Sequence, residues 1–236
     1  MPAKPTIVKD NKTALVVGYE GFVGHHLVPM LVEHEAYSHL YIVSGKKPII
    51  SNDNINWINK SINNLNFDGM EINDLFICYD ASFFNSGGKY SIDKNNYKYF
   101  PKIILSAYRQ GVSQVLLLSS NTANPDGILF THRIRGLIEQ SVKRMGFWGA
   151  HIFRPSILIG ETIGQQWGQK IANQLGNRFD KYTGGWLRNN KPVEAVVVAK
   201  AMIEEAQMTE SGIFSYSSSW LQDYASTIKK TDISKK

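Results

Sequence analysis

The sequence predicts an α/β protein with a Rossmann-like, doubly wound parallel sheet, and three observations support this fold class. A short apolar run at residues 14–17 ends in three regularly spaced glycines, Gly18, Gly21 and Gly24. A helix-like apolar pattern follows at once, and strand-like and helix-like segments then alternate down the chain. Apolar runs this short are typical of strands that helices cover on both faces.

The glycine-rich turn indicates a nucleotide site. Gly18 permits a sharp turn after the strand, Gly21 lets a ligand approach the backbone, and Gly24 lets the helix lie close to the sheet. The N–H groups that open this helix favour a pyrophosphate. A tight turn without a ligand can carry the same glycines, so it is the alternation of strands and helices that favours nucleotide binding. The expected cofactor-binding residues here are Gly18, Tyr19, Glu20, Gly21, Phe22, Val23 and Gly24.

The end of the second expected strand, residues 40–43, bears on the choice of cofactor. An acidic residue there would bind the ribose 2′-hydroxyl of NAD, whereas basic residues suit the 2′-phosphate of NADP. The chain continues with Ser44, Gly45, Lys46 and Lys47 and has no carboxylate at this place. Two solvated lysines in a loop are the alternative interpretation. We predict that Lys46 and Lys47 bind the phosphate and that the cofactor is NADP(H).

The remaining segments complete a single domain over residues 1–236. We expect a dinucleotide-binding core over 12–160, a substrate-side region over 161–226 and a flexible basic tail over 227–236. Pro29 interrupts the first helix. The expected strands are 55–58, 74–80, 115–120 (the most hydrophobic, and so expected to be central), 150–155 and 213–216. The expected helices are 97–110, 131–145, 165–175 and 193–208, with a last helical turn at 220–225.

Composition narrows the class of protein. The single cysteine, Cys78, cannot form an internal disulfide, and no signal peptide or membrane-spanning stretch is visible, so we expect a cytoplasmic protein that does not associate with membranes. The net charge is +6, but the lysines and arginines are scattered along the chain, and part of the excess lies in the expected tail. This distribution argues against nucleic-acid binding. The expected partners are a dinucleotide and an unknown small-molecule substrate or protein.

Several motifs together resemble the extended and atypical short-chain dehydrogenases/reductases, in particular the NAD(P)H-binding proteins similar to the Tat-interacting oxidoreductase. The likeness runs over residues 12–225 and implies a Rossmann-like fold that binds NADP(H), with the 2′-phosphate held by Gly45-Lys46-Lys47. It also implies cofactor contacts for Tyr79, Asp80, Arg135 and Pro155. The motifs are the glycine turn, residues 116–120 with Asn124-Pro125, Arg135-Gly136 with Glu139, residues 153–160, residues 191–195 and residues 198–202.

The same resemblance implies a catalytic site built from a serine and a Tyr/Lys pair four residues apart on one helix. The corresponding residues here are Ser120, Thr131 and Arg135. A threonine hydroxyl is too weak an acid to replace the phenol, and an arginine does not tune its neighbour as a lysine does.

Two hypotheses follow. The first is an NADP(H)-binding protein with a degenerate pair, weak or no dehydrogenase activity, and a redox-sensing or regulatory role. The alternative is an active oxidoreductase or isomerase on a small carbonyl or sugar-like substrate. It would use Ser120 with a water, or His132, as the proton donor. The sequence leaves open whether the protein is an enzyme.

Overall fold

The computed structural model describes most of the chain. The residues that it describes are 10–45, 47–50, 52–59, 65, 67, 69–79, 99–159 and 191–234. The expected helix at 165–175 lies outside them, as do Lys46 and Asp80.

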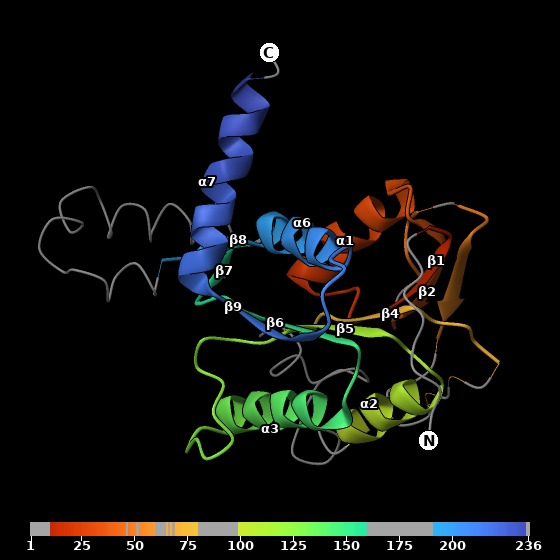
Figure 1. The fold of residues 1–236 in the computed structure, drawn as a ribbon, viewed down its shortest axis with the longest axis horizontal. Coiled ribbons are helices and arrows are strands. Elements are labelled where there is room, and N and C mark those ends of the chain that lie inside the picture. The colour runs from red at the N-terminus through yellow and green to blue at the C-terminus, as the bar shows by residue number, and fades with distance from the viewer. Residues whose placement is uncertain are drawn as a thin grey trace, which may run out of the picture.

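A seven-stranded sheet forms the centre of the molecule, and every neighbouring pair of its strands is parallel (Figure 1). The strand order is β3-β2-β1-β4-β5-β6-β9, so it changes direction between β1 and β4. In open α/β sheets such a switch point opens a ligand crevice at the carboxyl ends of the strands. The strands are β1 Lys12–Val17, β2 Tyr37–Val43, β3 Ile55–Ile58, β4 Asp74–Ile77, β5 Gln114–Leu118, β6 Gly149–Arg154 and β9 Gly212–Ser217.

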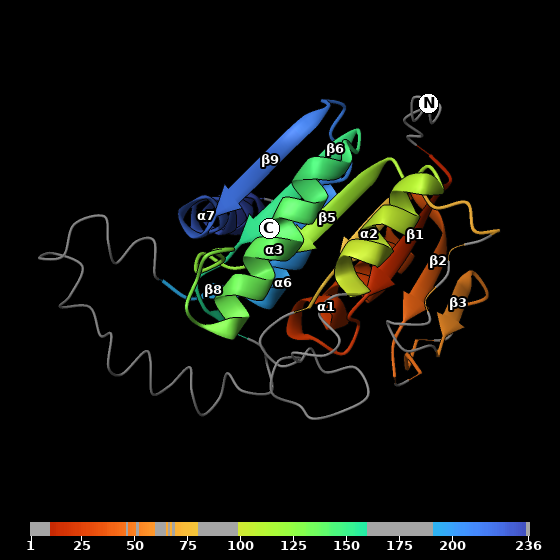
Figure 2. The ribbon, with the colours of Figure 1, turned by 90° about the horizontal axis from the view of Figure 1, so that it is seen from below.

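Helices cover both faces of this sheet. Helices α1 (Phe22–Glu33) and α6 (Ala195–Glu205) pack on one face, and α2 (Tyr99–Arg109) and α3 (Phe130–Met145) on the other (Figures 1 and 2). Residues along β1 alternate between two buried clusters: Ala14 and Val16 join the first, on the α1/α6 face, and Leu15 and Val17 the second, on the α2/α3 face. This alternation explains the unbroken apolar run and confirms the predicted Rossmann-like fold class.

Some elements differ from the expectation. Strand β5 is buried throughout, but it lies beside the middle strand β4 and is not itself central. The helix expected from residue 193 is preceded by a short strand, β8 (Val193–Glu194), which pairs with β7 (Leu158–Ile159). Both differences depend on strand pairing between distant segments, which local patterns do not record.

The last helix, α7 (Ser218–Ser234), is longer than the turn expected at 220–225. Its backbone continues through residues 227–234, which composition assigned to a flexible tail, and its C-terminal end projects beyond the layers (Figure 1). The side chains of Ser226 and Thr227 donate hydrogen bonds to carbonyls one turn earlier, at 2.9 and 3.1 Å. Helical hydrogen bonds are local, so a segment with little apolar surface can still continue a helix.

A buried ion pair joins the amino ends of the central strands. The ammonium of Lys12, which is 2% exposed, lies 2.9 Å from Asp74 and donates to the carbonyl of Ala206 at 2.7 Å. Tyr37 donates to the same carboxylate at 2.6 Å, and Gln114 donates to Asp74 and to Ala206. The network therefore connects β1, β2, β4 and β5 to the end of α6. Removing one member of such a pair typically costs about 3–5 kcal/mol.

A second buried polar group, His151 on β6, is fully shielded from solvent. Its ring stacks on Phe214 and Tyr216, and its Nδ1 lies 2.8 Å from the Tyr216 hydroxyl. That hydroxyl donates its proton to Glu205, so Nδ1 of His151 is the donor to the hydroxyl. Burial, and secondarily the charge of Lys12, lowers the pKa of His151 from 6.5 to about 4.

We predict that His151 makes stability fall in acid. The unfolded chain protonates this imidazole at a higher pH than the folded chain, so the contribution is complete above pH 6.5 and is lost as the pH falls to about 4. The loss amounts to about 3 kcal/mol. Urea unfolding of the wild type and His151→Gln at pH 7 and pH 4.5 measures it. The variant should lose less stability than the wild type over this interval, and equal losses would contradict the prediction.

Candidate dinucleotide site

The glycine turn lies at the switch point, where β1 and β4 run side by side. Gly18 has a φ of +96°, and a Cβ on it would lie 2.9 Å from the carbonyl of Cys78, just after β4. A Cβ on Gly24 would lie 2.3 Å from the oxygen of Gly18. The turn therefore closes only with glycine at both positions. Gly21 is the N-cap of α1 and brings no side chain over the first N–H groups of the helix, which is the arrangement that suits a pyrophosphate.

The other apolar residues predicted to bind the cofactor pack inward. Tyr19 is 6% exposed and Val23 is fully buried, and both belong to the first cluster. Phe22 is partly buried and packs against the same cluster. Their side chains thus attach α1 to the sheet, and it is the backbone of this turn that a dinucleotide would meet.

Glu20 is the member of the turn that reaches across to the neighbouring strand. Its carboxylate accepts a hydrogen bond from the backbone N–H of Gly45, two residues beyond the end of β2. Ser44 lies between the end of β2 and Gly45 and is fully buried. Trp57 of β3 donates from Nε1 to the carbonyl and the hydroxyl of Ser44 at 3.2 and 3.1 Å. Sequence reasoning placed Glu20 near the pyrophosphate and missed this contact.

Lys47, one of the two residues predicted to bind a 2′-phosphate, is exposed. It lines a shallow depression with Asn52, Ile55 and Trp57, on the β3 side of the loop. The role of the lysine pair remains a prediction, because its other member lies outside the described residues.

Two further predicted cofactor residues meet at the carboxyl ends of β4 and β5. Tyr79 and Arg135 line one small cavity together with Ser119 and Phe100. The Tyr79 ring packs edge-on against Phe100, with centroids 5.0 Å apart. The fold therefore places Arg135 of α3 near Tyr79 at the carboxyl ends of these strands, and the cofactor contacts that the resemblance implies for both residues stay a prediction.

The predicted catalytic residues lie on α3 and in the loop that follows β5. Thr131 and Arg135 are one turn apart on α3. The Ser120 hydroxyl lies 2.9 Å from that of Thr122 and accepts the Thr122 N–H at 3.2 Å, which is the geometry of a serine turn. Pro155, just after β6, is buried and accepts the N–H of the residue after Ser120 at 3.1 Å through its carbonyl.

The position after Arg135 requires a glycine, Gly136, because another backbone segment packs against it. A Cβ there would lie 2.1 Å from the nitrogen of Pro125, so the loop after β5 crosses α3 at backbone contact. The N–H of Asn124 donates to the carbonyl of His132 at 3.0 Å and fastens the crossing. This packing sets the distance between the serine loop and the helix that carries the expected catalytic positions.

A buried carboxylate holds this side of the site together. Glu139 of α3 is 2% exposed and accepts two hydrogen bonds from the guanidinium of Arg154 on β6. It also accepts the Ser119 hydroxyl at 2.5 Å, and Lys143 lies 3.6 Å away. Hydrogen bonding to Glu139 raises the pKa of Arg154. Sequence reasoning used Glu139 only as part of a family pattern; the available signal was an acid on the apolar face of a helix.

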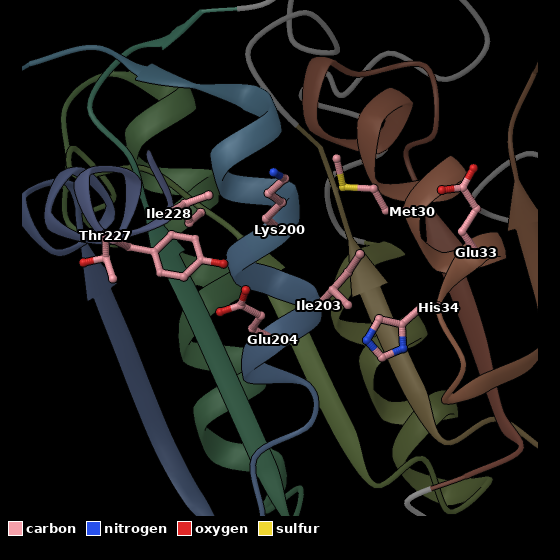
Figure 3. Close-up of a pocket in the computed structure, with 9 residues that line it drawn as sticks. Met30, Glu33, His34, Lys200, Ile203, Glu204, Thr227 and Ile228 are labelled. Carbon is pink, nitrogen blue, oxygen red and sulfur yellow. The ribbon is translucent and has the colours of Figure 1, made fainter. Parts of the chain in front are cut away.

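A separate groove of about 720 Å³ lies away from the glycine turn, between α1, α6 and α7 (Figure 3). Its lining mixes apolar and charged side chains, among them Met30, Glu33, His34, Lys200 and Glu204. The α1 members lie at the opposite end of that helix from the glycines, so the groove is not part of the predicted crevice. Within the described residues, no three His, Cys, Asp or Glu side chains gather as metal ligands. No helix in the described part of the chain has the length and apolar character needed to cross a bilayer.

Comparisons with known proteins agree on the fold. The solved structure of the Bordetella bronchiseptica enzyme WbmH in complex with NAD+ gives a TM-score of 0.64 at 12% identity, covering 94% of this chain and 82% of that one. MoeE5 in complex with UDP-glucose and NAD gives 0.62 at 16%, covering 86% and 74%. A short chain dehydrogenase family protein from Francisella tularensis gives 0.57 at 14%, covering 89% and 99%. The fold is therefore that of NAD-binding Rossmann proteins.

No family model matches the chain. Its curated relatives include "Protein FMP52, mitochondrial" of Debaryomyces hansenii, 22% identical over 82% of this chain and 87% of the relative. The protein of the same name from Candida glabrata is 25% identical over 88% and 92%. The likeness to the Tat-interacting group in particular finds no support in these matches.

The expected cytoplasmic location is contradicted, because these relatives carry mitochondrial names. The expectation rested on a lone cysteine and on the lack of a secretory signal. Both features fit any reducing compartment and do not single out the cytosol.

We predict that Gly24→Ala disrupts the site. Its methyl group would lie within 2.3 Å of the Gly18 oxygen, so α1 must move away from the turn. Overpacking of this kind typically costs 1–3 kcal/mol. Thermal unfolding and NADH titration measure the two consequences, and both stability and affinity should fall.

The matched control is His25→Ala, which adds no atoms and changes an exposed position on the same helix. It should leave NADH affinity near the wild-type value. Unchanged stability and affinity in Gly24→Ala would show that the turn tolerates a Cβ, contrary to the geometry.

Proposed function

We propose that the protein binds a nicotinamide dinucleotide at the glycine turn and is a relative of the short-chain dehydrogenases/reductases with little dehydrogenase activity of its own. The observation that carries the proposal is the close backbone packing at Gly18 and Gly24, where any Cβ would clash with neighbouring backbone atoms and prevent the turn. Gly21 leaves the start of α1 without a capping side chain. A bound dinucleotide would place its pyrophosphate on these N–H groups and extend across the switch point towards Tyr79 and Arg135.

The residues on the α3 side favour binding over turnover. When bound, the nicotinamide supplies hydride chemistry, and the protein must then add or remove a proton. Thr131 offers only an alcohol for this task, and Arg135 stays protonated. Arg135 is well suited to hold a ribose or a phosphate, because its planar guanidinium donates several hydrogen bonds. These residue types support a redox-sensing or regulatory role, in which cofactor binding itself is the functional event.

The relatives' names support a mitochondrial setting for this role. The alternative of an active oxidoreductase or isomerase requires another proton donor. The Ser120 hydroxyl, one of the two candidates, already lies in a serine turn with Thr122. That observation favours a structural role for it.

We predict that the purified wild type binds NADH or NADPH but reduces generic aldehydes and ketones very slowly. General acid catalysis contributes about 10²–10⁴-fold, so its absence leaves binding intact and turnover weak. The double variant Thr131→Tyr, Arg135→Lys restores a phenol beside an ammonium one turn away on α3. It should raise turnover by an amount within that range. Absorbance at the nicotinamide band measures turnover, and fluorescence titration measures binding.

The single variant Arg135→Lys is the control, because it changes the cation without supplying the phenol at position 131, and it should stay as slow as the wild type. Rapid wild-type turnover that is lost in Ser120→Ala or His132→Ala, with affinity preserved, would favour the alternative. Failure of the wild type to bind either dinucleotide would refute the proposed function.

A further inference from the structure

The carboxylate of Glu20 stands at the place where Rossmann proteins choose between NAD and NADP. It leaves the chain in the turn after β1 and accepts the N–H of Gly45, just after β2. These two strands are neighbours, with Val17 paired to Val43 at their carboxyl ends. The carboxylate therefore bridges the carboxyl ends of β1 and β2, on the adenosine side of the switch point.

The usual occupant of this place is an acid at the end of the second strand, about 20 residues after the glycines, which accepts the ribose 2′-hydroxyl of NAD. In this chain the residues at that point are Ser44, Gly45, Lys46 and Lys47, without a carboxylate. Glu20 supplies from the first strand's turn what the second strand lacks. The contact with Gly45 brings the acid to this location, and a pattern search along β2 cannot find it.

Both sides of the contact are held in place. On one side, the N–H of Gly21 donates to the Gly18 carbonyl at 3.2 Å and sets the turn that carries Glu20. On the other, Trp57 donates to the carbonyl and the hydroxyl of the buried Ser44, which fixes the approach to Gly45. Glu20 itself is only partly buried, so its carboxylate remains within reach of a ligand.

The chemistry of a carboxylate at this position discriminates between the two cofactors. A carboxylate has two oxygens and about four acceptor sites, so it can accept the Gly45 N–H and a ribose hydroxyl at the same time. A 2′-phosphate has no proton to offer at neutral pH and would bring about two negative charges against the acid. The described member of the lysine pair, Lys47, is exposed and lines the β3 side of its loop.

We propose that Glu20 is the specificity residue of the site, that it accepts the adenine-ribose 2′-hydroxyl, and that it makes the protein selective for NAD(H) over NADP(H). This inference rests on the proposed dinucleotide function and deepens it. It reverses the cofactor choice that the Lys46–Lys47 pair predicts from the sequence alone.

The test is titration of NADH and of NADPH into the protein. The wild type should bind NADH at least about tenfold more tightly, the effect of one charge-assisted hydrogen bond. Glu20→Ser should weaken NADH binding and bring the two affinities within about threefold or reverse their order. Glu20→Gln keeps an oxygen that can accept the Gly45 N–H but removes the charge. It guards against a folding defect: NADPH binding should improve, and NADH binding should fall less than in Glu20→Ser, because the amide oxygen still accepts a hydrogen bond.

The charge-matched control is Glu35→Gln. Glu35 is an exposed acid in the turn before β2, at the opposite end of that strand from Gly45. It should leave the ratio of the two affinities unchanged. A wild type that prefers NADPH, and loses the preference in the double variant Lys46→Ala, Lys47→Ala, would overturn the inference while leaving dinucleotide binding intact. A ratio that does not change in Glu20→Ser would also overturn it. Binding of neither cofactor would refute the proposed function and the inference together.

Discussion

The buried pair between Lys12 and Asp74 is the constraint on which the arrangement of the sheet depends. It lies at the amino ends of the strands and, through Tyr37, Gln114 and the carbonyl of Ala206, ties four strands to the last helix of the α1/α6 layer. Charges this deeply buried are tolerated only when every partner is in place. The network therefore favours one register for β1, β2, β4 and β5.

The buried network lies at the amino ends of the strands, and the glycine turn lies at their carboxyl ends. There the chain is built from close backbone contacts, with Gly18 against the end of β4 and Gly24 against Gly18. Side chains of the turn that point inward attach α1 to the core, while Glu20 extends sideways to Gly45. The buried ion pair and the proposed ligand site thus lie at opposite ends of the strands of one sheet, a division that parallel strands with a topological switch point make available.

On the α3 side of the predicted crevice, hydrogen bonds and close packing hold the helix in place. Glu139 joins Arg154 and Ser119, and Gly136 allows the loop after β5 to cross the helix at contact distance. These interactions fix the part of α3 around Arg135 relative to β5 and β6. The position one turn earlier carries Thr131, whose alcohol is a weak acid, and this supports the proposal that the site holds a cofactor and does not transfer a proton efficiently.

The sequence by itself determined the features that depend on near neighbours: the strand before the glycine turn, the helix after it, the alternation of elements and hence the fold class. It also predicts a cofactor beside Gly18, Gly21 and Gly24, because a turn without Cβ atoms is a local requirement. Only the tertiary structure decided that Lys12 pairs with Asp74, 62 residues away, and that Glu20 meets Gly45, 25 residues away. The sequence shows that these residues are charged but not which groups they contact. The pairing of strands that are distant in the sequence brings the partners together.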